Sequence, residues 1–533
     1  MNADAVTNAE VMESARLDSP HLADLVERAA CQSPNAQAVV VDSARTPLSY
    51  RDLIGLVDDL AAQFKRGGLL PGDRVALRMS SSAEFVVGLL AASRAGLIAV
   101  PLDPALPVGE QRARSEAAGA RVVLVDAEGP GDNGEPALRW WPIAVAVARA
   151  GGAPAVHLDP ATAPKGDVAA PEGLRDDDAM IMFTGGTTGV PKMVPWTRAN
   201  IAASVRAIVA GYELGPRDAT VAVMPLYHGH GLLAALLATL ASGGTVLLPA
   251  RGRFSAHTFW DDIGTVRATW YTAVPTIHQI LLERARTEHP GGTRPLRFIR
   301  SCSAPLTAET AQALQDVFSA PVVCAFGMTE ATHQVATTSI GAAGNGENPA
   351  ATPGLVGRST GPEIRIVGPD GEPAPAEAVG EVWLRGPTVV RGYLGDPAIT
   401  AANFTDGWLR TGDLGSLSPD GELTIRGRIK ELINRGGEKI SPEHVEGILA
   451  GHPDVLEVAV LGVADKMYGE SVAAVIVPRG SASPSSAELT EFCRGRLAPF
   501  EVPATFQLAS ELPHTAKGSL DRRAVAEQFG RGA

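Results

Sequence analysis

The chain has 533 residues, of which 45% are hydrophobic and 20% are charged, and this composition indicates a globular protein of two or more domains. Its net charge of -13 argues against a nucleic-acid or anionic-membrane surface, because such surfaces require clustered Lys and Arg. The four cysteines are widely spaced, which argues against a disulfide framework or a zinc motif. There is neither a secretion signal nor an apolar run of about 18 residues, so we expect a cytoplasmic protein without membrane insertion.

The N-terminal third of the chain alternates between predicted helices and predicted strands. Apolar periodicity predicts helices over residues 22–30, 50–64 and 83–95. Short apolar runs predict strands over residues 38–41, 74–77, 98–101, 121–125 and 179–183. Strands joined by crossover helices are typical of layered parallel sheets. Residues 150–174 are rich in Ala, Gly, Pro and Asp, and we expect them to form an irregular surface connection.

The C-terminal part of the chain has a different pattern. Residues 381–385 and 422–426 alternate between apolar and polar side chains, as antiparallel strands do. Ser441 followed by Pro442 predicts the start of a capped helix. We therefore predict an α/β protein with a large N-terminal domain of layered α/β subdomains, residues 1–427, and a smaller, mobile C-terminal α+β domain, residues 428–533.

A segment rich in glycine and hydroxyl groups follows the strand predicted at residues 179–183. Backbone N–H groups of a glycine-rich loop, hydroxyl donors and a lysine together suit a phosphate group. The adjacent Gly-Lys of a P-loop is absent, so a P-loop nucleotide hydrolase is not indicated. The candidate phosphate-binding residues are Thr184, Gly185, Gly186, Thr187, Thr188 and Lys192.

This segment closely resembles the phosphate-binding signature of the adenylate-forming superfamily, with Gly185 where serine is commoner. Residues 325–330 resemble the second core motif of that family. The resemblance implies that Phe326 lies against adenine, that Gly327 is a nucleotide-binding residue, that Thr329 binds the α-phosphate and that Glu330 is a magnesium ligand. Those residue types suit the roles, because an aromatic ring stacks on a base and a carboxylate is a hard ligand for Mg²⁺.

Two further segments resemble nucleotide-binding motifs of the family. Residues 301–306 are similar to the loop around adenine, which implies that Ser303 and Ala304 contact the nucleotide and that Cys302 is structural. Residues 407–413 are similar to the ribose motif, in which Asp413 would accept hydrogen bonds from both ribose hydroxyls. Arg428 is the remaining nucleotide-binding residue that the resemblance implies.

The acyl site is implied by the same resemblance. Residues 224–231 are similar to the motif beside the acyl pocket, so His228 is a candidate catalytic, pocket-gating residue and His230 a less certain one. Residues 270–278 and 297–303 look most like the oxalate–CoA ligase branch, which implies a small or dicarboxylic acid. Medium-chain, aryl and polycyclic acids stay open. The implied acyl-binding residues are His228, Ser301, Gly327 and His333, and His228 and His333 are candidates to meet a second carboxylate.

The segment after residue 427 resembles the hinge and the CoA-binding loop of the family. Lys430 lies at the implied pivot, and Gly436, Gly437 and Lys439 lie in the loop that lines the pantetheine tunnel. Glycines there would permit the close passage of a slender ligand. The resemblance implies an acid–thiol ligase that makes acyl-CoA from a carboxylic acid through an acyl adenylate, with ATP or acyl-AMP, Mg²⁺ and CoA as cofactors.

One departure from the family pattern concerns catalysis. The family commonly has Pro-x-Thr-x-Thr-Gly-Lys near its C-terminus, and this chain has Ser519 where that pattern has its catalytic lysine. The lysine offsets negative charge while the acid attacks ATP, and loss of one such donor costs about 3 kcal/mol, or about 100- to 1,000-fold in rate. We therefore expect a ligase that joins a ready-made acyl adenylate to CoA, and a separate adenylating enzyme that supplies it.

Three alternatives remain open at this point. Lys517, two residues before Ser519, could replace the missing lysine, which would leave a complete two-step acid–CoA ligase. The same motifs also occur in adenylating enzymes that load a carrier protein. A protein that binds nucleotide or thioester without catalysis is the third alternative, and Ser519 is its only support.

Overall fold

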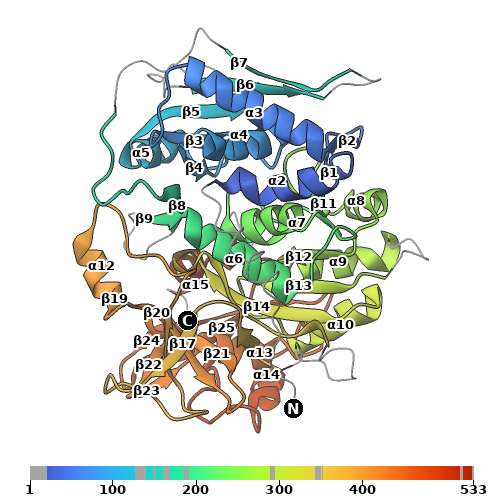
Figure 1. Cartoon of the computed structure of the whole chain (residues 1–533). Helices are drawn as coiled ribbons and strands as arrows, with labels where there is room; N and C mark the ends of the chain where they lie inside the picture. Colours follow the sequence, from blue (N-terminus) through green and yellow to red (C-terminus); the bar gives the residue numbers. More distant parts are fainter. Residues whose placement is uncertain are drawn as a thin grey trace, which may run out of the picture.

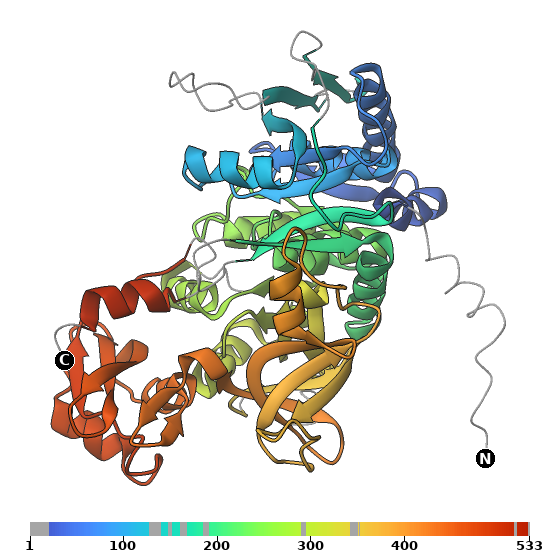
Figure 2. The ribbon, with the colours of Figure 1, turned by 90° about the vertical axis from the view of Figure 1, so that its left-hand side faces the viewer.

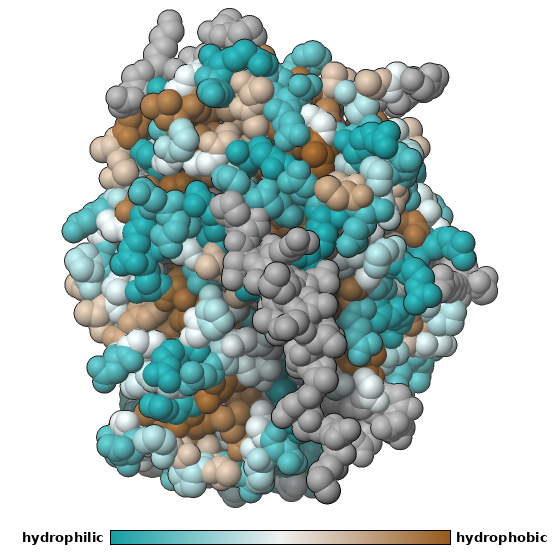
Figure 3. All heavy atoms as spheres, in the orientation of Figure 1, coloured by the Kyte–Doolittle hydropathy of each residue, from teal (hydrophilic) through white to brown (hydrophobic). Residues whose placement is uncertain are grey.

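The computed structural model describes residues 21–126, 140–147, 152–159, 168–184, 191–288, 295–341, 350, 352–515 and 520–530. Its strands form four sheets, and one of them, a five-stranded sheet, lies in the C-terminal part of the chain (Figure 1). Within the described ranges, no helix has the length and apolar character needed to cross a bilayer. On the face shown in Figure 3, hydrophobic residues are interspersed among hydrophilic ones.

A seven-stranded sheet lies at one end of the molecule, at the top of Figure 1, in the order β7-β6-β5-β3-β4-β8-β9. Strand β3 pairs in parallel with β4 and β5, which confirms the predicted parallel arrangement. Helices α3 (Tyr50–Arg66), α4 (Ala83–Arg94) and α5 (Val108–Ala117) pack against it. The strands are β3 (Arg74–Arg78), β4 (Ile98–Leu102), β5 (Ala120–Asp126), β6 (Trp140–Ala146), β7 (Ala155–Leu158), β8 (Asp178–Thr184) and β9 (Lys192–Thr197).

Strand β7 corrects part of the prediction of an irregular connection over residues 150–174, of which residues 168–174 are irregular as predicted and residues 150, 151 and 160–167 lie outside the described residues. It pairs antiparallel with β6 and buries Val156 and Leu158. The Gln63 side chain occupies its outer edge, with Nε2 donating to the Val156 carbonyl at 2.8 Å and Oε1 accepting from the Leu158 N–H at 2.9 Å. An edge strand of four residues is too short for its alternation to stand out among Ala, Gly and Pro.

The N-terminal part of the chain also contains a four-stranded and a ten-stranded sheet. In the ten-stranded sheet, β12, β13 and β14 are parallel, and the later strands pair antiparallel, as predicted for residues 381–385 and 422–426. The four-stranded sheet contains β1 (Gln37–Val41), β2 (Thr46–Ser49), β10 (Ala219–Val221) and β11 (Thr245–Leu247). The ten-stranded sheet contains β12 (Trp270–Ala273), β13 (Phe298–Cys302), β14 (Val322–Met328), β15 (His333–Thr337), β16 (Leu355–Ser359), β17 (Glu363–Val367), β18 (Gly380–Arg385), β19 (Phe404–Thr405), β20 (Trp408–Leu417) and β21 (Glu422–Arg428).

Helical elements surround these two sheets and connect their strands (Figure 1). One of them, η2, is a π-helix, a rare form that is frequent at functional sites. The elements are α2 (Leu22–Gln32), α6 (Arg198–Gly211), η2 (His230–Leu237), α7 (Ala238–Ala241), α8 (Phe259–Val266), α9 (Pro275–Glu288), α10 (Ala308–Phe318), η3 (Thr329–Ala331) and α12 (Pro397–Asn403).

The C-terminal part of the chain has a five-stranded sheet with its own apolar core and lies to one side of the larger part in Figure 2. The Ser441 hydroxyl accepts a hydrogen bond from the His444 N–H, so the predicted helix cap is present. The predicted class, a large N-terminal α/β part with a smaller C-terminal α+β part, is confirmed. The elements are η5 (Ile429–Glu431), β22 (Ile433–Arg435), β23 (Glu438–Ile440), α13 (Pro442–Leu449), β24 (Val455–Asp465), β25 (Gly469–Pro478), α14 (Ser486–Cys493), β26 (Thr505–Leu508) and α15 (Arg522–Phe529).

Candidate active site

The candidate phosphate loop connects two paired strands. Thr184 is the last residue of β8 and pairs with Lys192, the first residue of β9, so both ends of the loop are held by one antiparallel hairpin. The other candidate phosphate-binding residues lie outside the described residues: Gly185, Gly186, Thr187 and Thr188. The hairpin therefore fixes the backbone position of Lys192 at the end of the loop.

Lys192 and Glu330 meet around one aromatic ring. The Lys192 ammonium lies 4.5 Å from the centre of the Tyr393 ring, and the Tyr393 hydroxyl donates to Glu330 Oε1 at 2.9 Å. The Glu330 carbonyl also accepts from the Val390 N–H at 2.9 Å. Burial lowers the pKa of Lys192, the nearby Glu330 carboxylate opposes that shift, and the charge of Lys430 adds to it. The implied hinge lysine therefore acts electrostatically on the phosphate-loop lysine.

Glu330 fits the role of a magnesium ligand. It is buried, and the Trp196 indole N–H donates to the neighbouring Thr329 carbonyl at 2.8 Å, which fixes the backbone of this motif. In the described part of the chain, no three His, Cys, Asp or Glu side chains cluster as a metal cage would require. A single buried carboxylate such as that of Glu330 suits Mg²⁺, which is commonly bound by one or two carboxylates together with substrate phosphates and water.

Asp413 is a buried carboxylate with one free acceptor. Its Oδ1 lies 2.8 Å from Arg428 Nε, whereas its Oδ2 has no hydrogen-bond partner among the described residues. Burial raises the pKa of Asp413 to about 6, although the Arg428 guanidinium opposes the shift. An unpaired buried oxygen is costly, and ribose hydroxyls would supply the missing donors.

Adenosine binding is expected to weaken as the pH falls through about 6. The ribose hydroxyls donate to the ionised carboxylate, and Asp413 is increasingly protonated below its raised pKa of about 6. Adenosine itself does not titrate in this range, so calorimetry should show about tenfold weaker binding at about pH 5 than at about pH 7.5. The Asp413→Asn variant should bind weakly at both pH values, and an unchanged pH dependence in that variant would refute the assignment.

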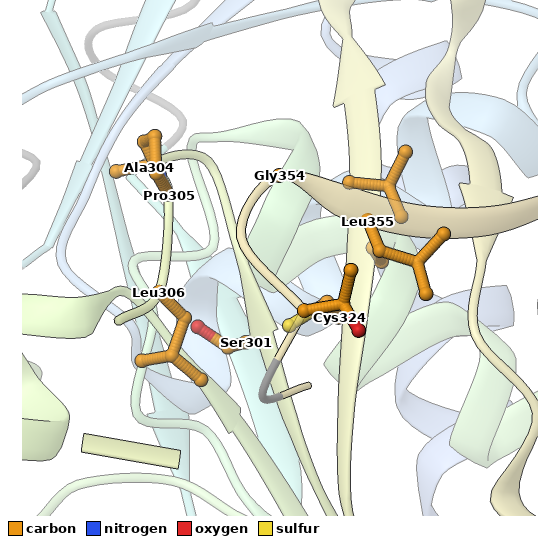
Figure 4. Close-up of a pocket in the computed structure, with 10 residues that line it drawn as sticks. Ser301, Ala304, Pro305, Leu306, Cys324, Gly354 and Leu355 are labelled. Atoms are coloured by element: carbon orange, nitrogen blue, oxygen red, sulfur yellow. The ribbon is translucent and has the colours of Figure 1, made fainter. Parts of the chain in front are cut away.

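The candidate adenine loop follows β13. Ser303 has a positive φ of 75°, and Ala304 comes next, while Phe326 on the neighbouring strand β14 is partly buried. A cavity of about 30 Å³ lies between Ser301 and Leu306 on one side and Cys324 on the other (Figure 4). That volume holds about one water molecule and is far too small for a nucleotide or an acyl group.

The acyl-site candidates meet where β14 turns into β15. A Cβ atom on Gly327 would lie 1.6 Å from the His333 carbonyl oxygen, so only glycine fits this close approach. The His333 and His230 rings stack with centroids 5.2 Å apart, and the π-helix η2 starts at His230. The His228 ring lies 4.8 Å from the Tyr227 ring, and Ser301 Oγ is buried without a hydrogen-bond partner in the described part of the chain.

The structure adds one residue that the motif analysis did not assign. Arg300 is completely buried in β13, and it donates hydrogen bonds to both His230 and His333. In the sequence, Arg300 could have been noticed as a charged residue within the mainly apolar segment from Phe298 to Cys302. Burial of a charge costs free energy unless the charge has a partner.

The candidate CoA-binding residues form an exposed hairpin between β22 and β23. Gly436 and Gly437 are its two turn residues, with φ of 62° and 102°, and Lys439 is exposed on β23. The Gly436 N–H donates to the Tyr468 carbonyl at 2.7 Å, which anchors this turn to the turn between β24 and β25. Lys430 is exposed in η5, between the two parts of the chain, and Lys517 and Ser519 lie outside the described residues.

Comparison with known proteins agrees with these motifs. A family model for the AMP-binding enzymes matches residues 26–394, and one for the AMP-binding enzyme C-terminal domain matches residues 444–519. The chain is 40% identical to the oxalate–CoA ligase of Arabidopsis thaliana, over 96% of this chain and 99% of that protein. It is 35% identical to the sulfoacetate–CoA ligase of Cupriavidus necator, over 94% and 96%.

The solved structures that are similar include ligases with bound nucleotide. ATP-bound MatB from Rhodopseudomonas palustris has a TM-score of 0.81 and 28% identity, over 95% of this chain and 99% of that one. MenE, the o-succinylbenzoate–CoA synthetase of Bacillus subtilis, in complex with ATP and magnesium, has a TM-score of 0.77 and 28% identity, over 94% and 98%.

The fold and the family matches are thus those of an adenylate-forming enzyme. The chain belongs to the AMP-binding enzymes of the adenylate-forming superfamily, as an acid–thiol ligase that forms acyl-CoA through an acyl adenylate. Its substrates are a carboxylic acid and CoA, and ATP and Mg²⁺ are the cofactors of this class.

Proposed function

We propose that this ligase mainly performs the second half-reaction, the transfer of an acyl group from an acyl adenylate to CoA, and that it adenylates its own acid slowly. The observation that carries this proposal is Ser519 at the position of the family's catalytic lysine. A serine cannot offset the negative charge that builds up when a carboxylate attacks the α-phosphate.

The described residues on either side of positions 516–519 are held by several contacts. His514 and Leu520 form a β-bridge, and the Asp521 N–H donates to the Pro513 carbonyl at 2.9 Å. Arg522 follows directly and pairs with Glu446 at 2.7 Å. A shift of the flanking segments by two positions would break these contacts, which argues against a change of register that would replace Ser519 by Lys517.

The chain's own residues suit the thioester step. Lys192 and Thr329 would hold the phosphate of the adenylate, Asp413 its ribose, and Glu330 a magnesium ion that supplies charge neutralisation at the phosphate. The CoA sulfur forms a bond to the acyl carbon, the bond from that carbon to the phosphate oxygen breaks, and AMP leaves while the thiol proton passes to solvent. Positioning contributes much of such a step, and none of it requires a cation at position 519.

The C-terminal domain would bring the thiol to this site. We place the domain boundary after residue 427 and the pivot at Lys430, with Gly436, Gly437 and Lys439 beside the pantetheine arm. The exposed turn supports this role, because its two glycines carry no side chain that would obstruct a slender ligand. Rotation of a domain about a short hinge is a common way to present different faces to one site.

Two further parts of the proposal concern the source of the acyl adenylate and the chemical class of the acid. If adenylation is slow, a separate adenylating enzyme supplies the acyl adenylate. The acid is small and carries a second acidic group, a view supported by relatives that are named for oxalate and for sulfoacetate. His228 and His333 would then lie on the wall that meets the far end of the acyl group.

The experiment compares two ways of supplying each acid of a panel. One sample contains the free acid with ATP and Mg²⁺, the other contains the synthetic acyl adenylate, and both contain CoA. Mass spectrometry measures the acyl-CoA formed. Product from the adenylate that exceeds product from the free acid by about 100-fold or more would support the proposal. Equal turnover from both would refute it and identify a complete two-step ligase.

A further inference from the structure

Arg300 is a buried charge that has only uncharged partners. It lies at the centre of β13, flanked by Ile299 and Ser301, and its side chain is completely buried. Its guanidinium donates to uncharged acceptors at distances of 2.8–3.1 Å, which are Tyr212 Oη, Thr272 Oγ1, His230 Nε2, His333 Nε2 and Gln334 Oε1. Among the residues that the structure describes, no carboxylate lies within ion-pair distance of it.

Two less buried arginines, Arg391 and Arg297, each have a carboxylate partner. Arg391 pairs with the fully buried Asp178 at 2.6 Å, and Arg297, three positions before Arg300, pairs with Asp218 at 2.7 Å. A buried guanidinium stays charged, and hydrogen bonds alone recover only part of the cost of its desolvation. The position of Arg300 beside the acyl-site histidines indicates that its counter-ion arrives with the substrate.

The hydrogen bonds of Arg300 also assign the proton of each histidine. Because Arg300 donates to Nε2 of both His230 and His333, those nitrogens are acceptors, and the proton of each neutral ring is on Nδ1. Burial and the Arg300 charge lower both pKa values well below the usual value, so the rings stay neutral. The Nδ1–H of His230 faces Ser303 Oγ at 3.1 Å, and that of His333 has no partner among the described residues.

The backbone around the acyl-site histidines is strained, and strained backbone is commonly found at functional sites. Ser303, Thr332 and His333 all have positive φ, of 75°, 48° and 76°. Hydrogen bonds hold the strained turn in place, because the Thr332 hydroxyl donates to the Thr388 carbonyl and the Ser204 hydroxyl donates to the Thr332 carbonyl, both at 2.6 Å. His333 is thus presented to the acyl site in one orientation.

We propose that Arg300 is the specificity-determining residue of the acyl site and selects acyl groups whose far end is a carboxylate or a sulfonate. All five of its N–H groups already have acceptors, so it acts as a positioning residue. It fixes His333 as an N–H donor, holds His230 in the tautomer that donates to Ser303, and supplies a fixed positive charge behind both rings. The inference rests on the proposed function only in that an acyl adenylate occupies this site, and it holds whichever enzyme makes that adenylate.

Acylsulfamoyl adenosines, which are stable mimics of acyl adenylates, test this directly. In each pair of equal length, one compound ends in a carboxylate and the other in the carboxamide. Calorimetry is expected to show that the wild-type protein binds the carboxylate compound about 10- to 100-fold more tightly. Arg300→Gln is expected to remove this preference, and the conservative Arg300→Lys to keep part of it. Equal binding of both compounds by the wild type would overturn the proposal.

AMP binding serves as the control for folding, because AMP has no acyl group. Arg300→Gln should bind AMP as the wild type does, so a retained preference for the carboxylate compound in that variant would also overturn the proposal. If Arg300→Gln does not bind AMP, His333→Ala replaces it, and the same loss of preference is expected. The comparison uses no turnover from free acid or from adenylate, so its result is independent of the half-reaction that the enzyme performs.

Discussion

Replacing Ser519 with lysine is expected to raise the rate of ATP-dependent adenylation by about 100- to 1,000-fold. The new ammonium group would stand where the family has its lysine and would offset charge between the acid and the α-phosphate. Pyrophosphate exchange with the preferred acid measures this half-reaction alone. The rate of thioester formation from a synthetic adenylate should stay within about twofold, because that step does not need the lysine.

Lys517→Ala is the matched control for this prediction. If no other side chain replaces the catalytic lysine, removal of the Lys517 side chain should change the rate of pyrophosphate exchange very little. A wild-type exchange rate that is already high and is lost in Lys517→Ala would show that Lys517 replaces the missing lysine. In that case Ser519→Lys should add little, and the enzyme would be a complete two-step ligase.

The second large effect is expected from Gly327→Ala. The added Cβ atom would lie 1.6 Å from the His333 carbonyl oxygen, so β14 and β15 would have to move apart. Overpacking of this kind costs about 1–3 kcal/mol, and a misplacement of about 1 Å at a reacting centre lowers the rate by about 100-fold. Thioester formation from a synthetic adenylate and the thermal midpoint should therefore both fall.

Gly55→Ala provides the matched control. Gly55 is an exposed residue of α3, and a Cβ atom there meets nothing within 4 Å. This substitution is expected to stabilise the protein by about 0.5–1 kcal/mol, because glycine is a poor helix former, and to leave turnover unchanged. Gly327→Ala with wild-type turnover and a wild-type thermal midpoint would contradict the close approach between the two strands.

The layered N-terminal architecture could be predicted because its buried strands leave a strong signal. Strand β4, for example, is buried at all five positions and appears in the sequence as an uninterrupted apolar run. Strand β7 could not be predicted, because its stability comes from pairing with β6 and from Gln63, which lies far away in the sequence. A local pattern carries no information about such a partner.

The chemical types at the candidate site could be named from motifs, whereas their geometry could not. Phe326, Gly327 and Glu330 are adjacent in one motif, but the reason for glycine is the backbone of His333 on the next strand. Arg300 was visible as a charge in an apolar strand, yet its role depends on where four other segments place their acceptors. Long-range packing of this kind is fixed by the tertiary structure.

The burial of His230 and His333 has a consequence for kinetic experiments. Histidine is the usual explanation when an enzyme loses activity between about pH 7 and pH 5. In this enzyme burial and the Arg300 charge lower the pKa of both rings well below the usual value, so they take up a proton only at a lower pH than an ordinary histidine. An acidic limb near pH 6 in a rate profile would therefore not report His230 or His333, whereas the Asp413 carboxyl, whose pKa is raised to about 6, titrates in that region.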